Sequence, residues 1–153
     1  MKRALAFLLV LLQMLLLLAL VILPHGNFWP VNAFVVATGL VLGVAGVALA
    51  VQGAINLGPA LTASPIPRAR APLSTQGVYG LVRNPIYTGF MLGGLALVLV
   101  GSSLVHVLAW FALVWVLAAK ARWEERMLID QHPDYSDYAA RVGRFLPGLG
   151  RLR

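Results

Sequence analysis

Three long apolar tracts constrain the fold of this chain more than any other feature of its sequence. They cover residues 4–23, 31–57 and 86–119. A helix crosses the hydrocarbon core of a bilayer with about 20 apolar residues, so each of the first two tracts predicts one crossing. The third tract is long enough for two short helices, because Gly101-Ser102-Ser103 near its middle predicts a tight turn. We therefore expect an all-α integral membrane protein with four transmembrane helices, the last two over about 85–100 and 104–128.

Composition supports a membrane environment. The chain is 60% hydrophobic and 11% charged, whereas soluble domains are roughly half apolar and a quarter charged. The net charge of +7 raises the question of nucleic acid, but the basic residues flank the apolar tracts, which favours membrane lipids as partners. The chain has no cysteine, which excludes disulfides, thiolate zinc sites and a cysteine nucleophile. We predict no metal site and no nucleic-acid partner, and the oligomeric state stays open.

The basic residues predict the orientation of the helices. With four crossings, all twelve lysines and arginines fall on one side, and the loops on the other side, 24–32 and 101–103, carry none. The positive-inside rule then places both termini in the cytoplasm, together with the segment that contains Arg68 and Arg70. Three crossings would separate the termini and remove this bias. We expect a multi-pass protein of a bacterial inner membrane.

We predict one domain, 1–153, which prolines and polar segments divide into four parts. Four prolines within residues 58–83 prevent a continuous helix there. Near the end, Tyr135, Tyr138 and Val142 share one face of a short amphipathic helix. The parts are a first helical hairpin (1–57), a cytoplasmic cofactor-binding loop (58–84), a second hairpin (85–130) and a C-terminal interfacial segment (131–153).

The polar residues in the middle of the chain predict a binding site at residues 77–89. Asn84 and Pro85 form a favoured helix start, whose free N–H groups and dipole attract an anion. Arg83 can hold a carboxylate or phosphate with two hydrogen bonds. The aromatic faces of Tyr79 and Tyr87 attract cations.

A second polar stretch, Glu124-Glu125, lies one helical hairpin downstream and adds negative charge. Elements for anions and for cations in one place suggest a ligand that carries both charges. The residues taken alone equally allow an ordinary membrane-surface loop with scattered arginines.

An ordered series of motifs resembles the isoprenylcysteine carboxyl methyltransferase family, within the wider group of membrane methyltransferases that includes phospholipid N-methyltransferases. The resemblance covers about residues 57–147. Its elements are Gly77-Val78-Tyr79, Arg83-Asn84-Pro85, Tyr87, Gly89, Glu124-Glu125, Leu128, Tyr135, Tyr138, Arg141-Val142 and Leu146-Pro147.

The resemblance implies S-adenosylmethionine as cofactor and S-adenosylhomocysteine as product. The family commonly has His where this chain has Asn84, so only a capping or hydrogen-bonding role carries over there. On the acceptor side the family's basic residue falls on Lys120, although Arg122 matches equally well. The implied cofactor-binding residues are Leu73, Ser74, Tyr79, Asn84, Pro85, Ile86, Tyr87 and Glu124, and the candidate catalytic residues are Arg83, Lys120 and Glu125.

These observations predict an S-adenosylmethionine-dependent methyltransferase that acts on a lipophilic acceptor at the cytoplasmic interface. Two alternatives stay open, a nicotinamide-dependent membrane reductase and a small membrane transporter. Transporters usually carry ionisable residues within their crossings, whereas the larger polar residues of these tracts include Gln13, Asn56 and His106, and none of them is Asp, Glu, Lys or Arg. The methyltransferase hypothesis requires that Tyr87 and Glu124 lie side by side.

Overall fold

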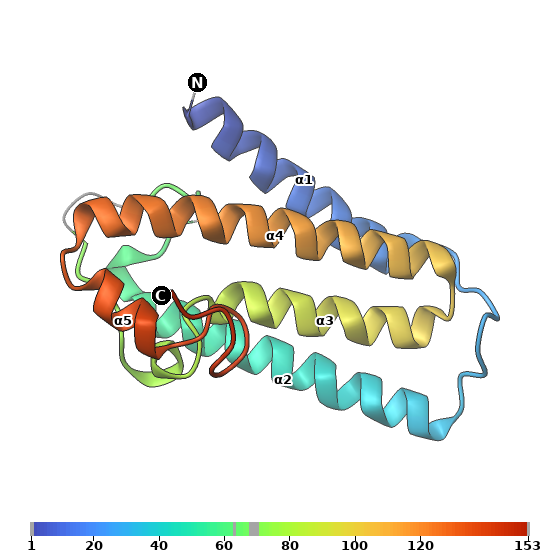
Figure 1. Cartoon of the computed structure of the whole chain (residues 1–153). Coiled ribbons are helices and arrows are strands. Elements are labelled where there is room, and N and C mark those ends of the chain that lie inside the picture. The colour runs from blue at the N-terminus through green and yellow to red at the C-terminus, as the bar shows by residue number, and fades with distance from the viewer. Residues whose placement is uncertain (1, 63, 68–70, 153) are drawn as a thin grey trace.

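The computed structural model describes the whole chain except residues 1, 63, 68–70 and 153, and the elements of the described residues are all helices (Figure 1). Arg68 and Arg70, which marked the predicted cytoplasmic loop, lie outside the described residues. No β-strand occurs in the described part of the chain, so the all-α prediction is confirmed. The elements are α1 (Lys2–Ile22), α2 (Ala33–Leu57), η1 (Gly58–Ala60), η2 (Gly77–Gly80), α3 (Pro85–Gly101), α4 (Leu104–Gln131) and α5 (Tyr135–Arg141).

Among the described residues, three helical segments are long and apolar enough to cross a membrane, which indicates an integral membrane protein. They are Arg3–Ile22, Ala33–Ala60 and Leu104–Gln131. The helix α3 is apolar but shorter, with 17 residues. At 1.5 Å per residue it spans about 25 Å, slightly less than the roughly 30 Å of a hydrocarbon core. The predicted helices are therefore present, and the count of four crossings stays a prediction.

Small residues bring α2 and α3 together. A Cβ atom added at Gly46 would lie 2.6 Å from the carbonyl oxygen of Gly89, and one added at Gly89 would lie 2.4 Å from that of Gly46. Only hydrogen atoms fit in this contact, so the two backbones touch directly. Two helical turns before Gly46 in α2, Gly39 faces Val100 of α3. The α2 glycines thus serve packing within one chain.

The predicted turn at Gly101–Ser103 is present and is fastened to the loop between α1 and α2. Ser102 adopts a left-handed conformation with φ 44°, and its hydroxyl donates to the Trp29 carbonyl (2.6 Å) and accepts from the Trp29 N–H (2.9 Å). The Trp29 indole donates to the carbonyl of Leu99 (2.9 Å). These bonds satisfy polar groups at the end of the bundle that carries no basic residue.

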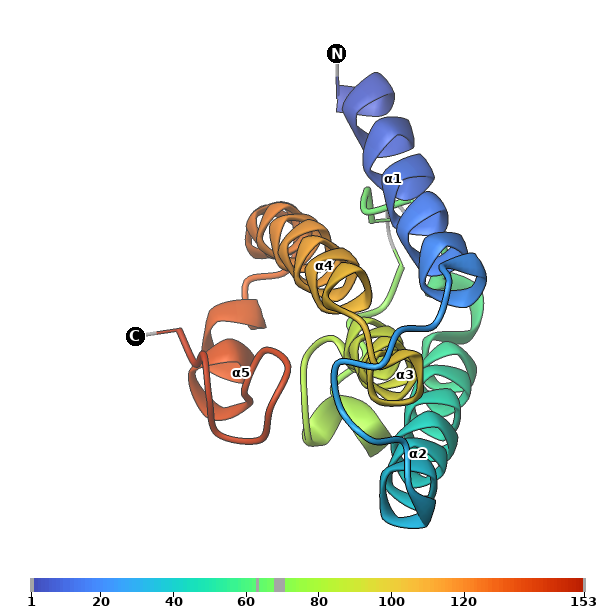
Figure 2. The same cartoon turned by 90° about the vertical axis from the view of Figure 1, so that its right-hand side faces the viewer.

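The two ends of the bundle differ in their architecture. The loop 23–32 and the turn between α3 and α4 lie together at one end, while the segment 58–84, α5 and the C-terminus gather at the other (Figure 1). The start of α1 leans away from the other helices (Figure 2). The polar segments that the sequence assigns to one side of the membrane are thus close in space.

Candidate functional site

A cavity of about 330 Å³ lies at the polar end of the bundle, where the loop 58–84 meets the start of α3 and the end of α4. Its volume falls within the range of small-molecule pockets, about 300–1,000 Å³. Pro85 does not line it, because this residue packs under α2 against Gly53. All the other predicted site residues do: Leu73, Ser74, Tyr79, Arg83, Asn84, Ile86, Tyr87, Lys120, Glu124 and Glu125.

Tyr87 and Glu124 meet in the wall of this cavity, as the methyltransferase hypothesis requires. The Tyr87 hydroxyl donates a hydrogen bond to Oε2 of Glu124 over 3.1 Å. The two residues come from the first turn of α3 and from the polar extension of α4, 37 positions apart in the chain. The Glu124 carboxylate and the face of the Tyr87 ring therefore form one surface on which a cation can be held.

Lys120 completes this group from one turn earlier in α4. Its Nζ lies 5.0 Å from the centroid of the Tyr87 ring and donates a hydrogen bond to Oε1 of Gln13 on α1. Lys120 and Gln13 are only 1% and 2% exposed. A buried ammonium thus faces the cavity beside the Tyr87–Glu124 pair.

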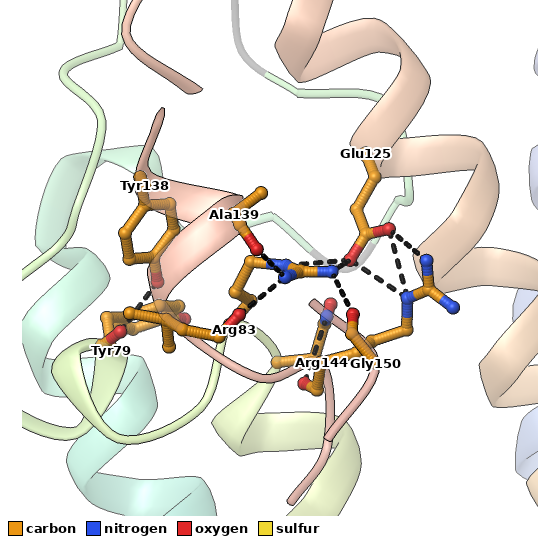
Figure 3. A network of polar contacts seen from close by, with 9 residues as sticks. Tyr79, Arg83, Glu125, Tyr138, Ala139, Arg144 and Gly150 are labelled. Atoms are coloured by element: carbon orange, nitrogen blue, oxygen red, sulfur yellow. Dashed lines mark hydrogen bonds and ion pairs between the residues drawn. The ribbon is translucent and has the colours of Figure 1, made fainter. Parts of the chain in front are cut away.

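Arg83 lies behind the cavity, in a network that Figure 3 shows from close by. Its Nε and Nη2 donate to Oε1 of Glu125 over 3.1 and 2.9 Å. The other donors reach backbone carbonyls of the C-terminal segment, those of Ala139 (2.8 Å), Val142 (2.5 Å) and Gly150 (3.0 Å). All five N–H groups of the guanidinium are therefore engaged within the protein.

Glu125 is held from its other side by Arg144. Nε and Nη2 of Arg144 reach Oε2 of Glu125 over 3.0 and 2.7 Å, and Nε also reaches Oε1 over 3.0 Å. Both oxygens of this buried carboxylate thus accept charge-assisted hydrogen bonds, and the carboxylate bonds raise the pKa of Arg144. The geometry supports a positioning role for Arg83 and Glu125, and their catalytic role stays a prediction.

Asn84 precedes α3 as expected but does not cap it with its side chain. Its Nδ2 instead donates to the carbonyl of Arg144 over 3.4 Å, so the capping interpretation is corrected and the hydrogen-bonding one remains. The first bonded N–H of the helix is that of Thr88, which donates to the Asn84 carbonyl (2.9 Å). The N–H groups of Ile86 and Tyr87, two residues that line the cavity, make no hydrogen bond within the described part of the chain.

Tyr79 belongs to η2 and lines the cavity where η2 meets the C-terminal helix α5. Its carbonyl accepts a hydrogen bond of 2.6 Å from the hydroxyl of Tyr138, and both rings are buried. Burial raises the pKa of Tyr79 well above its usual value and that of Tyr138 to about 12, so both phenols stay neutral. The predicted helix with Tyr135 and Tyr138 on one face is confirmed as α5, and these two side chains pack inward.

The segment with Leu73 and Ser74 is tied to the end of α2. The Ser74 hydroxyl donates to the carbonyl of Asn56 (3.3 Å), and the N–H of Val78 donates to the Asn56 side chain (3.4 Å). Gly77, with φ 60°, passes so close that a Cβ atom would lie 2.7 Å from Oδ1 of Asn56. The loop thereby closes the cavity without regular secondary structure.

Sequence reasoning did not assign Gln13 and Arg144 to the site. Gln13 carried a signal, because it is the one strongly polar residue within the first apolar tract. Arg144 carried none, since it is one of several arginines in a basic C-terminal segment. Its partnership with Glu125 depends on how that segment folds back over α4.

Comparisons with known proteins agree on the part of the chain that holds this cavity. A family model described as phospholipid methyltransferase matches residues 34–134, more than half of the 153 residues. The cobalt-zinc-cadmium resistance protein CzcN of Cupriavidus metallidurans is 39% identical over 116 residues, which are 74% of this chain and 51% of that protein. The nickel-cobalt-cadmium resistance protein NccN of Alcaligenes xylosoxydans xylosoxydans is 32% identical over 124 residues, 80% of this chain and 56% of that protein.

This chain thus spans about half the length of these curated relatives. No solved structure matches it. The region that the family model matches holds α3 and α4 and omits the whole of α1, where Gln13 lies, and the segment with Arg144.

Proposed function

Since the chain belongs to the phospholipid methyltransferase family, we propose that it is an S-adenosylmethionine-dependent methyltransferase that acts on a lipophilic acceptor at the cytoplasmic interface. The observation that carries the proposal is the Tyr87–Glu124 hydrogen bond in the wall of a cavity at the polar end of an apolar bundle. Family membership favours methyl transfer over a nicotinamide-dependent reductase and over a transporter.

The membrane arrangement is part of this proposal. All four long helices cross the bilayer of a bacterial inner membrane, and both termini lie in the cytoplasm. The chain is one domain, in which the loop 58–84 and the segment 131–153 enclose the cofactor between the two helical hairpins. The cavity then lies at the height of the lipid headgroups, so a hydrophobic acceptor enters it from the bilayer.

The residues present fit the charges of the cofactor, which carries a carboxylate, an ammonium and a sulfonium. The free N–H groups of Ile86 and Tyr87, at the helix start set by Asn84 and Pro85, suit a carboxylate. Glu124 and the faces of Tyr79 and Tyr87 suit the positive groups. Leu73 and Ser74 supply the opposite wall. The sulfonium provides an activated methyl group, whose bond to sulfur breaks as the bond to the acceptor forms, leaving a neutral thioether.

The protein's own contribution is alignment. Holding two reactants in line in a desolvated site is worth roughly 7–11 kcal/mol of the barrier. Lys120 faces the acceptor side of the cavity. Arg83 and Glu125 act as positioning residues, because their polar groups are already paired with each other, with Arg144 and with the C-terminal backbone. An amine or thiol acceptor has to lose a proton, which a carboxylate acceptor does not.

A labelled transfer experiment tests the proposal. Purified protein in detergent is incubated with S-adenosylmethionine that carries a labelled methyl group and with a bacterial lipid extract. The proposal predicts label in the organic phase for the wild type and much less for the Glu124→Gln variant at a limiting cofactor concentration. Reduction of extract components that depends on a nicotinamide cofactor, with no methyl transfer, would support the reductase instead.

A link to metal resistance is suggested by the names of the two curated relatives. In the described part of the chain, no three His, Asp or Glu residues gather as a metal site requires. We therefore propose that any contribution to resistance comes from the transfer reaction. In cells that lack this protein and are sensitive to cobalt, zinc or cadmium, growth on these metals should then be restored by the wild type and not by Glu124→Gln.

A further inference from the structure

Lys120 is a buried cation without a paired anion. It is 1% exposed, and within the described part of the chain no carboxylate forms an ion pair with it, since both salt bridges there belong to Glu125. Glu124, one turn further along α4, is bonded instead to the Tyr87 hydroxyl. The Glu124 carboxylate acts on Lys120 electrostatically but not at ion-pair distance. A buried ammonium without an anion in direct contact is unfavourable, so an anion brought by a ligand would stabilise it.

Gln13 fixes the direction in which the ammonium points. Its Oε1 accepts one of the three N–H donors of Lys120, and the Tyr87 ring lies beneath the ammonium at 5.0 Å. Both side chains line the cavity. The two remaining donors have no partner among the described residues, and the cavity is the open space beside them.

Among the described residues, no other cation in the cavity wall has donors to spare. The five N–H groups of Arg83 are taken up by Glu125 and by three backbone carbonyls. Arg144 is bound to Glu125 on the far side of the network and does not line the cavity. Of the cations in the described part of the wall, Lys120 is therefore the one whose donors are free for a ligand that brings a negative group into this cavity.

We propose that Lys120 and Gln13 form an oxyanion subsite, in which Gln13 is the positioning residue that turns the ammonium toward the carboxylate or phosphate of a bound ligand. The proposal rests on the proposed function and deepens it, because it brings α1 into the site. Two sources of the anion share this chemistry, the carboxylate of the cofactor and an acidic group on the acceptor.

Two pairs of probes distinguish these sources. The first pair is S-adenosylhomocysteine and its decarboxylated analogue, S-adenosyl-3-thiopropylamine, measured by titration calorimetry in detergent. The second pair is oleate and oleyl alcohol, whose bound copies are counted by native mass spectrometry. In each pair, one member carries the carboxylate and the other lacks it.

The variants separate an electrostatic role of Gln13 from a purely structural one. Gln13→Met removes the acceptor oxygen and keeps the volume, whereas Gln13→Glu keeps that oxygen and adds a negative charge beside Lys120. An oxyanion subsite predicts that Gln13→Glu weakens carboxylate binding more than Gln13→Met does. A structural contact predicts the reverse, because glutamate preserves the hydrogen bond. Lys120→Gln removes the charge. Its matched control is Arg122→Gln on the same helix, because Arg122, the other match to the family's basic residue, is exposed and does not line the cavity.

The proposal expects a preference of about tenfold or more for the carboxylate-bearing member of one pair in the wild type. Lys120→Gln and Gln13→Glu should abolish that preference, and Arg122→Gln should keep it. If these variants lose the carboxylate preference within the first pair, the subsite binds the cofactor. If they lose it within the second pair, the subsite binds the acceptor.

Equal binding within both pairs in the wild type, or preferences that all variants keep, overturn the proposal. Failure of S-adenosylhomocysteine to bind the wild type would overturn the proposed function, while the oleate pair would still decide on the subsite. Circular dichroism and thermal unfolding verify that each variant is folded. If Lys120→Gln does not fold, the proposal is decided by which Gln13 variant binds the carboxylate probe more weakly, Gln13→Glu or Gln13→Met.

Discussion

Glu124 and Glu125 are neighbours in the chain but belong to two regions of opposite character. Glu125 is enclosed by Arg83 and Arg144, and both of its oxygens are occupied. Glu124 faces the cavity and is held by one hydroxyl, that of Tyr87. The first region is a closed network in which every strong donor is paired, and the second keeps charges available to a ligand. A charged residue is therefore not identified as a binding residue by its charge alone. What identifies it is a hydrogen-bond donor or acceptor that has no partner within the protein.

The closed network also explains why the C-terminal segment follows its course. The N–H groups of Arg83 and Asn84 donate to the carbonyls of Gly143 (2.8 Å) and Arg144 (3.1 Å), beside the side-chain bonds of Arg83. A stretch without regular secondary structure is thus held by backbone and guanidinium together. Rigidity behind the cavity keeps α3 and α4 in register, so Tyr87 and Glu124 can meet.

The largest effect is expected from breaking the closed network with Arg83→Met. This change leaves the Glu125 carboxylate with one of its two buried partners and removes three bonds to the C-terminal backbone. Loss of one partner of a buried ion pair costs about 3–5 kcal/mol. The free energy of unfolding in mixed micelles should fall by this amount. Arg141→Met at an exposed position is the control, and an equal loss in both variants would contradict the closed network.

The open region should respond in the opposite way to Glu124→Gln. Its carboxylate has only one hydrogen-bond partner, so unfolding should change little. Binding of S-adenosylhomocysteine should weaken by about tenfold or more, because a bond to a charged group is worth roughly 1.5–3 kcal/mol. Calorimetry and thermal unfolding on the same preparations measure both quantities. A variant with normal affinity and poor stability would move Glu124 into the structural network.

A smaller effect is expected from Tyr87→Phe. The variant loses the 3.1 Å bond to Glu124 but keeps the ring beneath Lys120. One hydrogen bond contributes about 0.5–1.5 kcal/mol, so affinity for S-adenosylhomocysteine should fall roughly two- to tenfold. Tyr87→Ala removes the ring as well and should be worse. If the two variants bind equally, the ring contributes nothing to the site.

The smallest effect is expected from Asn84→His, which introduces the residue common in the resembling family. The Asn84 side chain makes a single long hydrogen bond, of 3.4 Å, to a carbonyl that also accepts the Asn84 backbone N–H. An imidazole N–H can replace that donor, so stability and affinity should change by less than about 1 kcal/mol. Complete loss of binding would show that the asparagine has a specific task in this chain.

The helices and the Tyr87–Glu124 contact could be predicted from the sequence because their signals are local. Apolar length sets the helices, Gly101-Ser102-Ser103 sets the turn, and Asn84-Pro85 sets the start of α3. The hairpin of α3 and α4 then brings its two polar ends together. The series of family motifs added the identity of the residues that line the cavity.

The role of Arg83 could not be predicted in the same way. An arginine before a helix start has the same sequence signature whether it binds a ligand or a buried glutamate. The decision depends on Ala139, Val142 and Gly150, whose carbonyls reach Arg83 only after the C-terminal segment folds back. Likewise, the contact of Gln13 with Lys120 joins residues 107 positions apart, and no local pattern encodes it.

The most direct test of this account is an experimental structure of the protein with S-adenosylhomocysteine bound. The account predicts the ligand between the start of α3 and the end of α4, in contact with Tyr87 and Glu124, while Glu125 stays bound to Arg83 and Arg144. A ligand elsewhere in the molecule, or Tyr87 and Glu124 too far apart to touch the same ligand, would contradict it.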